Sequence, residues 1–147
     1  VVATYPNSDA HGRVLRDELL AYAERRPLSV ACVPAVGQWK FINLLRLCTA
    51  AVGNSSSSLI EAAIIGTPAV DIGPRQGGRF RPPSVIHVEP EAEQIAAAIA
   101  EAVSPSYTRS VVTTMPFGGG DASARIARIL ATTKVSDTGK HFVDVLS

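Results

Sequence analysis

The sequence predicts an α/β domain whose helices cover both faces of a parallel sheet. Short runs that are apolar throughout alternate with amphipathic segments along most of the chain, and fully apolar strands are typical of parallel sheets buried on both sides. Polar segments rich in glycine, serine or arginine follow four of these runs. Because parallel strands all end at the same edge of a sheet, these segments predict one ligand-binding edge.

The first half of the chain is predicted to alternate strand and helix. A β-rich run at Val1–Tyr5 stops at a Pro-Asn turn, and Leu28–Val33 is the next strand. Asp9 is expected to cap the helix between them, which Pro27 ends. One side of that helix is expected to face inward: Val14, Leu15, Leu19 and Tyr22.

The same alternation continues to a last helix, which Asp121 is expected to cap. The expected elements between are a helix at Gly37–Leu47, strands at Cys48–Val52, Ala69–Ile72 and Ser84–Val88, a helix at Ser56–Ile65, and a helix that Pro90 begins and Val103 ends. Ser104–Gly120 is expected to be mostly irregular. About five strands between helices predict a Rossmann-like, doubly wound domain.

The composition excludes several classes of protein. Of the 147 residues 46% are hydrophobic and 18% are charged, and the net charge of +1 indicates neither a nucleic acid nor an anionic membrane as partner. No apolar run is long enough to span a bilayer. Cys32 and Cys48 are expected to be buried free thiols, which favours the cytoplasm. The three histidines show no metal-ligand spacing with them, so no metal site is expected.

The most informative segment is Gly53-Asn54-Ser55-Ser56-Ser57-Ser58, between an expected strand and an expected helix. Serine hydroxyls and the unpaired N–H groups of a helix N-terminus suit a phosphate. The alternative is that one serine simply caps the helix. Glu61 lies four residues after Ser57, on the same helix face. Its carboxylate suits a ribose diol, and a salt bridge, for instance with Arg75, is equally compatible.

Three arginines, Arg75, Arg79 and Arg81, follow the fourth strand in a glycine-rich loop. Arginine suits bidentate phosphate contact, although a solvated basic loop has the same composition. Asn7 and Gln38 follow other strands, where stabilising a turn is the favoured role. Neither a P-loop nor a G-x-G-x-x-G fingerprint is present, which disfavours kinases and dinucleotide-binding proteins.

These motifs resemble those of UDP-N-acetylglucosamine 2-epimerases, and the serine turn and the Arg-Gln pair resemble the hydrolysing branch, which feeds sialic-acid-like sugar synthesis. The similarity runs from Val1 to about Leu130. The segments that carry it are Tyr5-Pro6-Asn7-x-Asp9, Gly53-Asn54-Ser55-Ser56-Ser57, Glu61, Gly66-Thr67-Pro68, Ile72-Gly73-x-Arg75-Gln76-x-Gly78-Arg79 and Pro116-Phe117-Gly118-x-Gly120.

The resemblance implies a GT-B fold, in which two Rossmann-like domains enclose the active site. Residues 1–131 would be most of the C-terminal, UDP-binding domain without its first strand, and residues 132–147 a tail or docking segment. The implied UDP contacts are Ser55, Ser56 and Ser57 on the diphosphate with Arg75 assisting, Glu61 on the ribose, Asn7 beside the nucleotide, the backbone near Val33 on uracil, and Gln76 and Arg79 as further candidates. The implied reaction eliminates UDP from UDP-N-acetylglucosamine and adds water to the resulting glycal, which yields N-acetylmannosamine without a cofactor.

The resemblance also implies that this chain is incomplete as an enzyme. The acid/base carboxylates of the family come from the N-terminal domain, so we expect no catalytic residue here and no activity of the fragment alone. The expected partners are UDP or a UDP-sugar, the N-terminal domain of the same polypeptide, and a second copy, since the family often dimerises. Ser58, Phe117 and Gly119 depart from the family pattern. The alternative function is a non-catalytic or glycosyltransferase-type module that binds a nucleotide-sugar.

Overall fold

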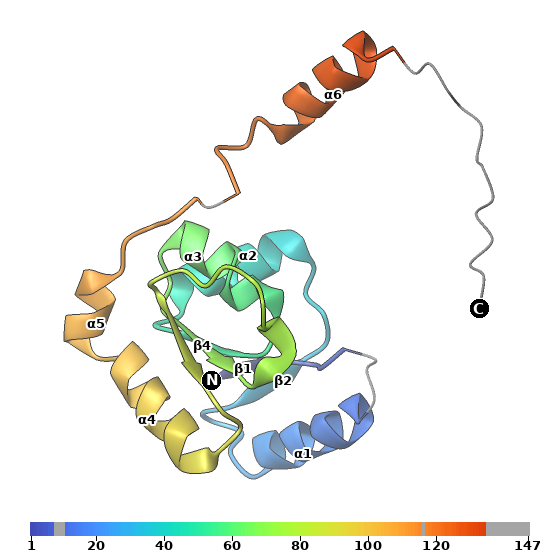
Figure 1. Ribbon diagram of the computed structural model, residues 1–147. Coiled ribbons are helices and arrows are strands. Elements are labelled where there is room, and N and C mark those ends of the chain that lie inside the picture. Colours follow the sequence, from blue (N-terminus) through green and yellow to red (C-terminus); the bar gives the residue numbers. More distant parts are fainter. Residues whose placement is uncertain (8–10, 116, 135–147) are drawn as a thin grey trace, which may run out of the picture. The chain divides into compact units, whose positions relative to one another are not determined.

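The computed structural model describes residues 1–7, 11–115 and 117–134. The chain divides into two compact units, Val1–Thr114 and Met115–Ser147. The first unit holds the strands and most helices (Figure 1). Its strands are β1 (Val2–Thr4), β2 (Ala31–Val33), β3 (Ala51–Gly53), β4 (Ala69–Ile72) and β5 (Val85–Val88). Its helices are α1 (Gly12–Glu24), α2 (Gln38–Leu47), α3 (Glu61–Ile65), α4 (Ala92–Ala102) and α5 (Pro105–Ser110), with 3₁₀ turns η1 (Ser56–Ser58) and η2 (Pro74–Gln76).

All strand pairs in the described residues are parallel, as predicted. They form two sheets, β1–β2 and β3–β4–β5. In the larger sheet the row Gly53, Asp71 and His87 runs across the three strands near their carboxyl ends. In the smaller sheet Thr4 is opposite Val33. Among the described residues β1 and β3 do not pair with each other. One edge of each sheet, at β1 and at β3, therefore has no strand partner there.

Helices cover both faces of the larger sheet, which gives the three-layer α/β/α arrangement expected of a Rossmann-like fold. On one face Leu45 of α2 and Ala62 of α3 pack with Ala69 and Val85. On the other face Ala98 and Ala102 of α4 pack with Val70. Figure 1 shows α2 and α3 on one side of the strands and α1 and α4 on the other. Successive residues of β4 therefore enter different helix layers, as the pleat of a strand requires.

The loop after β4 begins with a backbone conformation that favours glycine. Gly73 has φ 73°, and its N–H donates to the Val88 carbonyl at 2.8 Å, which ties the start of the loop to the end of β5. A side chain at this φ would be strained. Gly73 thus turns the chain directly from a buried strand into the arginine-rich loop.

Several predicted boundaries are wrong. The predicted helix at Ser56–Ile65 consists of the short 3₁₀ turn η1 and a separate five-residue helix, α3. Cys48 does not begin a strand, because its N–H donates to Leu44 and ends α2. Cys48 is exposed and Cys32 half-buried, so both are free thiols but neither is fully buried. The segment predicted to be irregular contains α5, which Ser104 caps by accepting from the Tyr107 N–H.

Helix starts and the outward face of α1 also differ from expectation. Glu91, rather than Pro90, is the N-cap of α4, and Asp121 precedes α6 without a side-chain cap. The apolar side of α1 is open, with Val14 62% and Leu15 54% exposed. Asp9 and the docking residues expected near the C-terminus lie outside the described residues.

The second unit contains α6 (Ala122–Thr132) among its described residues. The predicted apolar stripe of this helix is exposed, with Ile126, Ile129 and Leu130 between 57% and 74% accessible. In the described ranges of both units, no helix has the length and apolarity needed to cross a membrane.

Two alanines of α4 provide a test of the packing against β4. Ala98 is 4% exposed against Val70, whereas its neighbour Ala97 faces solvent. We expect Ala98→Leu to lower the free energy of unfolding by about 1–3 kcal/mol, because added methylene groups overpack a filled layer. Ala97→Leu, with the same change of helix propensity, should alter it by less than about 0.5 kcal/mol. Denaturant unfolding followed by circular dichroism measures both, and equal effects would contradict the layer assignment.

Candidate functional site

The serine turn lies at the carboxyl end of β3. Ser55 is its N-cap and has an extended backbone, and its Oγ accepts from the Ser57 N–H and donates to Ser57 Oγ, both at 3.4 Å. Ser55 is exposed, Ser56 and Ser57 are half-buried and Ser58 is buried. The hydroxyls of the first three serines are therefore accessible to a ligand, while the fourth serine belongs to the interior.

The division into η1 and α3 changes the physical basis of an anion site here. A five-residue helix adds little dipole, and η1 spans only three residues. Attraction for an anion must come from hydroxyl groups and from the first N–H groups of the 3₁₀ turn, which lack partners within the turn. A neighbouring cation would add to it.

The arginine-rich loop supplies such a cation, and it is tied directly to the serine turn. Arg75 Nη1 donates to the Asn54 carbonyl at 3.2 Å. Gln76 Nε2 donates to the same carbonyl at 2.7 Å. Asn54 immediately precedes the three accessible serines. The structure therefore brings the two most suggestive loops of the sequence together at one backbone atom.

Glu61 begins α3, below the serine turn. It is half-buried, and its Oε2 is buried without a hydrogen-bond partner among the described residues. A buried acceptor that lacks a donor costs free energy, so such atoms usually mark a site for water or a ligand hydroxyl. This is the chemistry that a ribose diol would satisfy.

A buried carboxylate supports the arginine-rich loop from below. Asp71 of β4 is fully buried, and its Oδ2 lies 3.1 Å from His87 Nδ1 and 3.4 Å from Arg81 Nη2. The contact with His87 is a hydrogen bond to a carboxylate in the tautomer whose proton lies on Nδ1. Asp71 thus forms an ion pair with one of the three loop arginines, Arg81, and this contact anchors the end of the loop to the sheet.

Two further candidate residues lie together at the end of the smaller sheet. Asn7 is exposed after β1, and the Val33 carbonyl accepts from the Tyr5 N–H at 3.0 Å. The Asn7 carbonyl lies so close to Gly12 that a Cβ there would collide with it.

Two other candidates are also exposed. Gln38 is the first residue of α2, and Arg79 lies in the loop after β4. A direct contact of any of these residues with a ligand stays a prediction.

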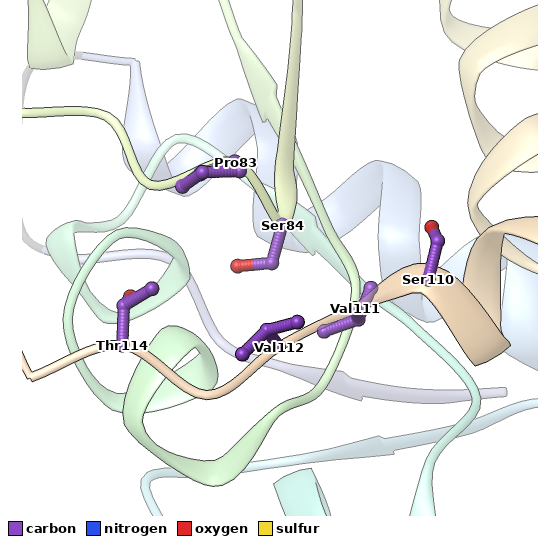
Figure 2. Close-up of a pocket in the computed structure, with 6 residues that line it drawn as sticks. All are labelled: Pro83, Ser84, Ser110, Val111, Val112 and Thr114. Carbon is purple, nitrogen blue, oxygen red and sulfur yellow. The ribbon is translucent and has the colours of Figure 1, made fainter.

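The cavity drawn in Figure 2 lies elsewhere. It has a volume of about 150 Å³ and is lined by Pro83, Ser84, Ser110, Val111, Val112 and Thr114. Ser84 precedes β5, so this cavity is at the amino ends of the strands, opposite the serine turn.

The two groups with a resolved pKa shift are also away from the serine turn and the arginine-rich loop. Partial burial of its thiol raises the pKa of Cys48, although the residue as a whole is exposed, and partial burial followed by the charge of Glu101 raises the pKa of Tyr107.

Two residues of this edge, Asn54 and Asp71, are not among the candidates that the sequence predicts. Asn54 contributes through its backbone carbonyl, for which a side-chain pattern gives no signal. Asp71 did leave a signal, since it is the one charged residue in an apolar strand and faces His87 in the next one. A charged residue in an otherwise apolar strand predicts a polar partner on the neighbouring strand, because a carboxylate is costly to bury alone; the partner here, His87, is itself exposed.

The fold and these loops together define a Rossmann-like α/β protein with its polar, cation-bearing loops at the carboxyl edge of the sheet. The chain belongs to the UDP-N-acetylglucosamine 2-epimerase family, whose model matches residues 1–131. A GT-B half is consistent with that membership.

Named relatives agree with the family. A UDP-N-acetylglucosamine 2-epimerase of Neisseria meningitidis serogroup B is 30% identical over 150 residues, which cover 99% of this chain and 38% of that protein. A UDP-N,N'-diacetylbacillosamine 2-epimerase (hydrolyzing) of Legionella pneumophila is 29% identical over 133 residues, 90% of this chain and 34% of that protein. A GDP/UDP-N,N'-diacetylbacillosamine 2-epimerase (hydrolyzing) of Campylobacter jejuni is 30% identical over 89 residues, 60% of this chain and 23% of that protein. The chain thus spans little more than a third of these relatives at most.

Asp71→Asn tests the anchor beneath the loop. It removes the charge that Arg81 and His87 share, so we expect the free energy of unfolding to fall by about 2 kcal/mol or more. Asp17→Asn is the matched control, because Asp17 forms an exposed pair with Arg16 at 2.9 Å, and should cost less than about 0.5 kcal/mol. Urea titration compares the two variants, and a loss for Asp71→Asn no larger than the control would show that the contacts of the buried carboxylate with Arg81 and His87 contribute nothing.

Proposed function

We propose that this chain is the UDP-binding, C-terminal part of a hydrolysing UDP-N-acetylglucosamine 2-epimerase. The observation that carries the proposal is the joining of the serine turn and the arginine-rich loop at the Asn54 carbonyl. It holds accessible hydroxyls and a guanidinium group side by side, as a diphosphate requires. Family membership and the relative that matches nearly the whole chain support the choice of UDP-N-acetylglucosamine as substrate.

The proposed contacts follow from the chemistry of each group. Ser55, Ser56 and Ser57 would donate to the diphosphate oxygens, and the guanidinium of Arg75 would add positive charge beside them. Glu61 would accept from the ribose, which supplies the donor that its buried Oε2 lacks. Asn7 and the backbone near Val33 would lie beside the base.

The rest of the polypeptide would complete both the sheet and the active site. In a doubly wound sheet of order 3-2-1-4-5-6, the first strand lies between the second and the fourth. The observed pairs β1–β2 and β3–β4–β5 match this order with that one strand left out, which supports a preceding strand and domain. The relatives' greater length supports it too. The free thiols of Cys32 and Cys48 support a cytoplasmic location.

The proposed reaction needs both domains. Loss of the C2 proton and cleavage of the bond between C1 and the diphosphate oxygen would release UDP and leave a 2-acetamidoglucal. Addition of water to its double bond would then give N-acetylmannosamine. This chain would hold the leaving diphosphate, and donors aimed at it stabilise the charge that grows there as the bond breaks. The proton transfers would come from the N-terminal domain.

Ser56→Ala combined with Arg75→Ala tests the diphosphate contacts. In the full-length protein we expect UDP to bind at least about 30-fold more weakly, because two donors, one of them charged, are lost. We also expect UDP release from UDP-N-acetylglucosamine to slow. Calorimetry and a UDP-release assay measure the two effects.

The matched control for this pair carries Ser106→Ala and Arg109→Ala on α5, where both side chains are exposed. It should bind UDP as the parent does. Failure of the parent to bind UDP would refute the proposal, and UDP binding without turnover would favour a nucleotide-sugar-binding module.

The ribose contact can be tested with an altered ligand. If Glu61 accepts from the diol, 2′-deoxy-UDP should bind about tenfold more weakly than UDP, the factor expected for one hydrogen bond to a charged group. Glu61→Ala should weaken UDP but remove most of the difference between the two ligands. A difference that persists in Glu61→Ala would assign the diol to another residue.

A further inference from the structure

We propose that Gln76 is a positioning residue, which orients the serine turn through the Asn54 carbonyl. For its ligand the inference rests on the proposed function. For its geometry it rests only on the hydrogen bond between the buried Gln76 amide and the backbone 22 positions earlier in the chain.

The orientation of the Gln76 amide is determined by its partner. A backbone carbonyl can only accept, so the group that faces Asn54 at 2.7 Å must be the amide NH₂. Gln76 is 3% exposed, and its Oε1 is buried without a donor among the described residues. A side chain this enclosed cannot exchange its partner for water, so the bond to Asn54 persists in the folded protein.

Gln76 is better placed to hold Asn54 than Arg75 is. Arg75 reaches the same carbonyl from an exposed position at 3.2 Å, where water competes for both groups. The backbone at Gln76 is itself restrained, because the Gly77 N–H donates to Pro74 at 2.8 Å and the Arg79 N–H donates to the Gln76 carbonyl at 3.3 Å. Gln76 therefore joins the two loops through a buried side chain, whereas the contact of Arg75 with Asn54 is exposed.

The bond controls the direction of a group on the ligand side. The peptide between Asn54 and Ser55 is trans, as all described peptides are, so the Ser55 N–H points opposite to the Asn54 carbonyl. Because that carbonyl points toward Gln76, the Ser55 N–H points in the opposite direction, away from the buried Gln76 side chain. Because η1 is only three residues long, its own hydrogen bonds are too few to fix this peptide plane.

The test compares Gln76→Met with Thr67→Val in the full-length protein. Thr67 is 5% exposed, and its Oγ1 donates to the Leu45 carbonyl, also 22 positions away, at 2.8 Å. The two substitutions thus remove similar buried bonds, but only the first touches the serine turn. Gln76→Leu is the second variant, because it also lacks the donor and offers a different packing shape if Gln76→Met fails to fold.

The first measurement is amide hydrogen exchange without ligand. The amides of Ser58, Leu59 and Ile60 donate within the turn to Ser55 and Ser56 at 3.0–3.1 Å. We expect these three to exchange about tenfold faster in Gln76→Met or Gln76→Leu, the factor of one net hydrogen bond, and to be unchanged in Thr67→Val. Unchanged exchange in the Gln76 variants, or equal acceleration in Thr67→Val, would overturn the inference.

The second measurement is the affinity for UDP, with a dissociation constant expected to rise about tenfold in the Gln76 variants and to stay at the parent value in Thr67→Val. Equal affinity of all variants would show that the orientation of Ser55 does not matter for binding and would overturn the inference. If the parent itself binds no UDP, the proposed function fails, and the exchange result alone decides the role of Gln76.

Discussion

The register of β4 between β3 and β5 is the constraint on which the rest of the edge depends. Gly53 is opposite Asp71 in the sheet, so β3 ends one residue before β4 does, and the serine turn begins one residue lower than the loop that begins at Gly73. The short turn η2 then needs only to fold back toward β3 for its side chains to reach Asn54. A shift of one residue would also turn Val70 and Asp71 to the wrong faces, because successive strand residues alternate. The same packing that stabilises the sheet therefore sets the height of both loops.

The sequence could predict most of this edge because apolar strands and polar loop residues leave a direct signal. Residue type and position make Ser55, Arg75 and Glu61 candidates, and the structure joins the loops of Ser55 and Arg75 at the Asn54 carbonyl. A contact of these three residues with a ligand stays a prediction. The split of the expected Ser56–Ile65 helix was not predictable in this way, since Leu59 and Ile60 continue an apolar pattern that suits either geometry. The turn is decided by tertiary contacts, with Leu59 1% exposed in the core under α2. The role of Asn54 was invisible because it belongs to the backbone.

The loop after β4 divides its charges among different tasks. Arg81 is drawn to the buried Asp71, which also holds His87, so this arginine neutralises an internal carboxylate. Arg75 reaches the backbone of the serine turn, and Arg79 is exposed. By composition alone the three arginines form one basic patch, but in the structure they have different roles. Arg81 is the least suited of the three to attract an anion, because its charge is balanced by the buried Asp71 carboxylate.

The larger sheet is more closely packed than the smaller one, and the two parts of the proposed ligand would contact different sheets. Every fully enclosed side chain among the described residues follows position 44, in α2, α3, β4, β5, α4 and their loops. Before it, Val2 and Val14 are more than half exposed. The loops proposed to hold the diphosphate therefore stand on the well-packed sheet, where little ordering remains to be done on binding. Asn7 and Val33, proposed to lie beside the base, stand on the sheet whose apolar surface is still open. A strand between β1 and β3 would bury that surface and join the two sheets. We therefore expect the proposed contacts with the base to depend on the rest of the polypeptide more than the proposed contacts with the diphosphate do.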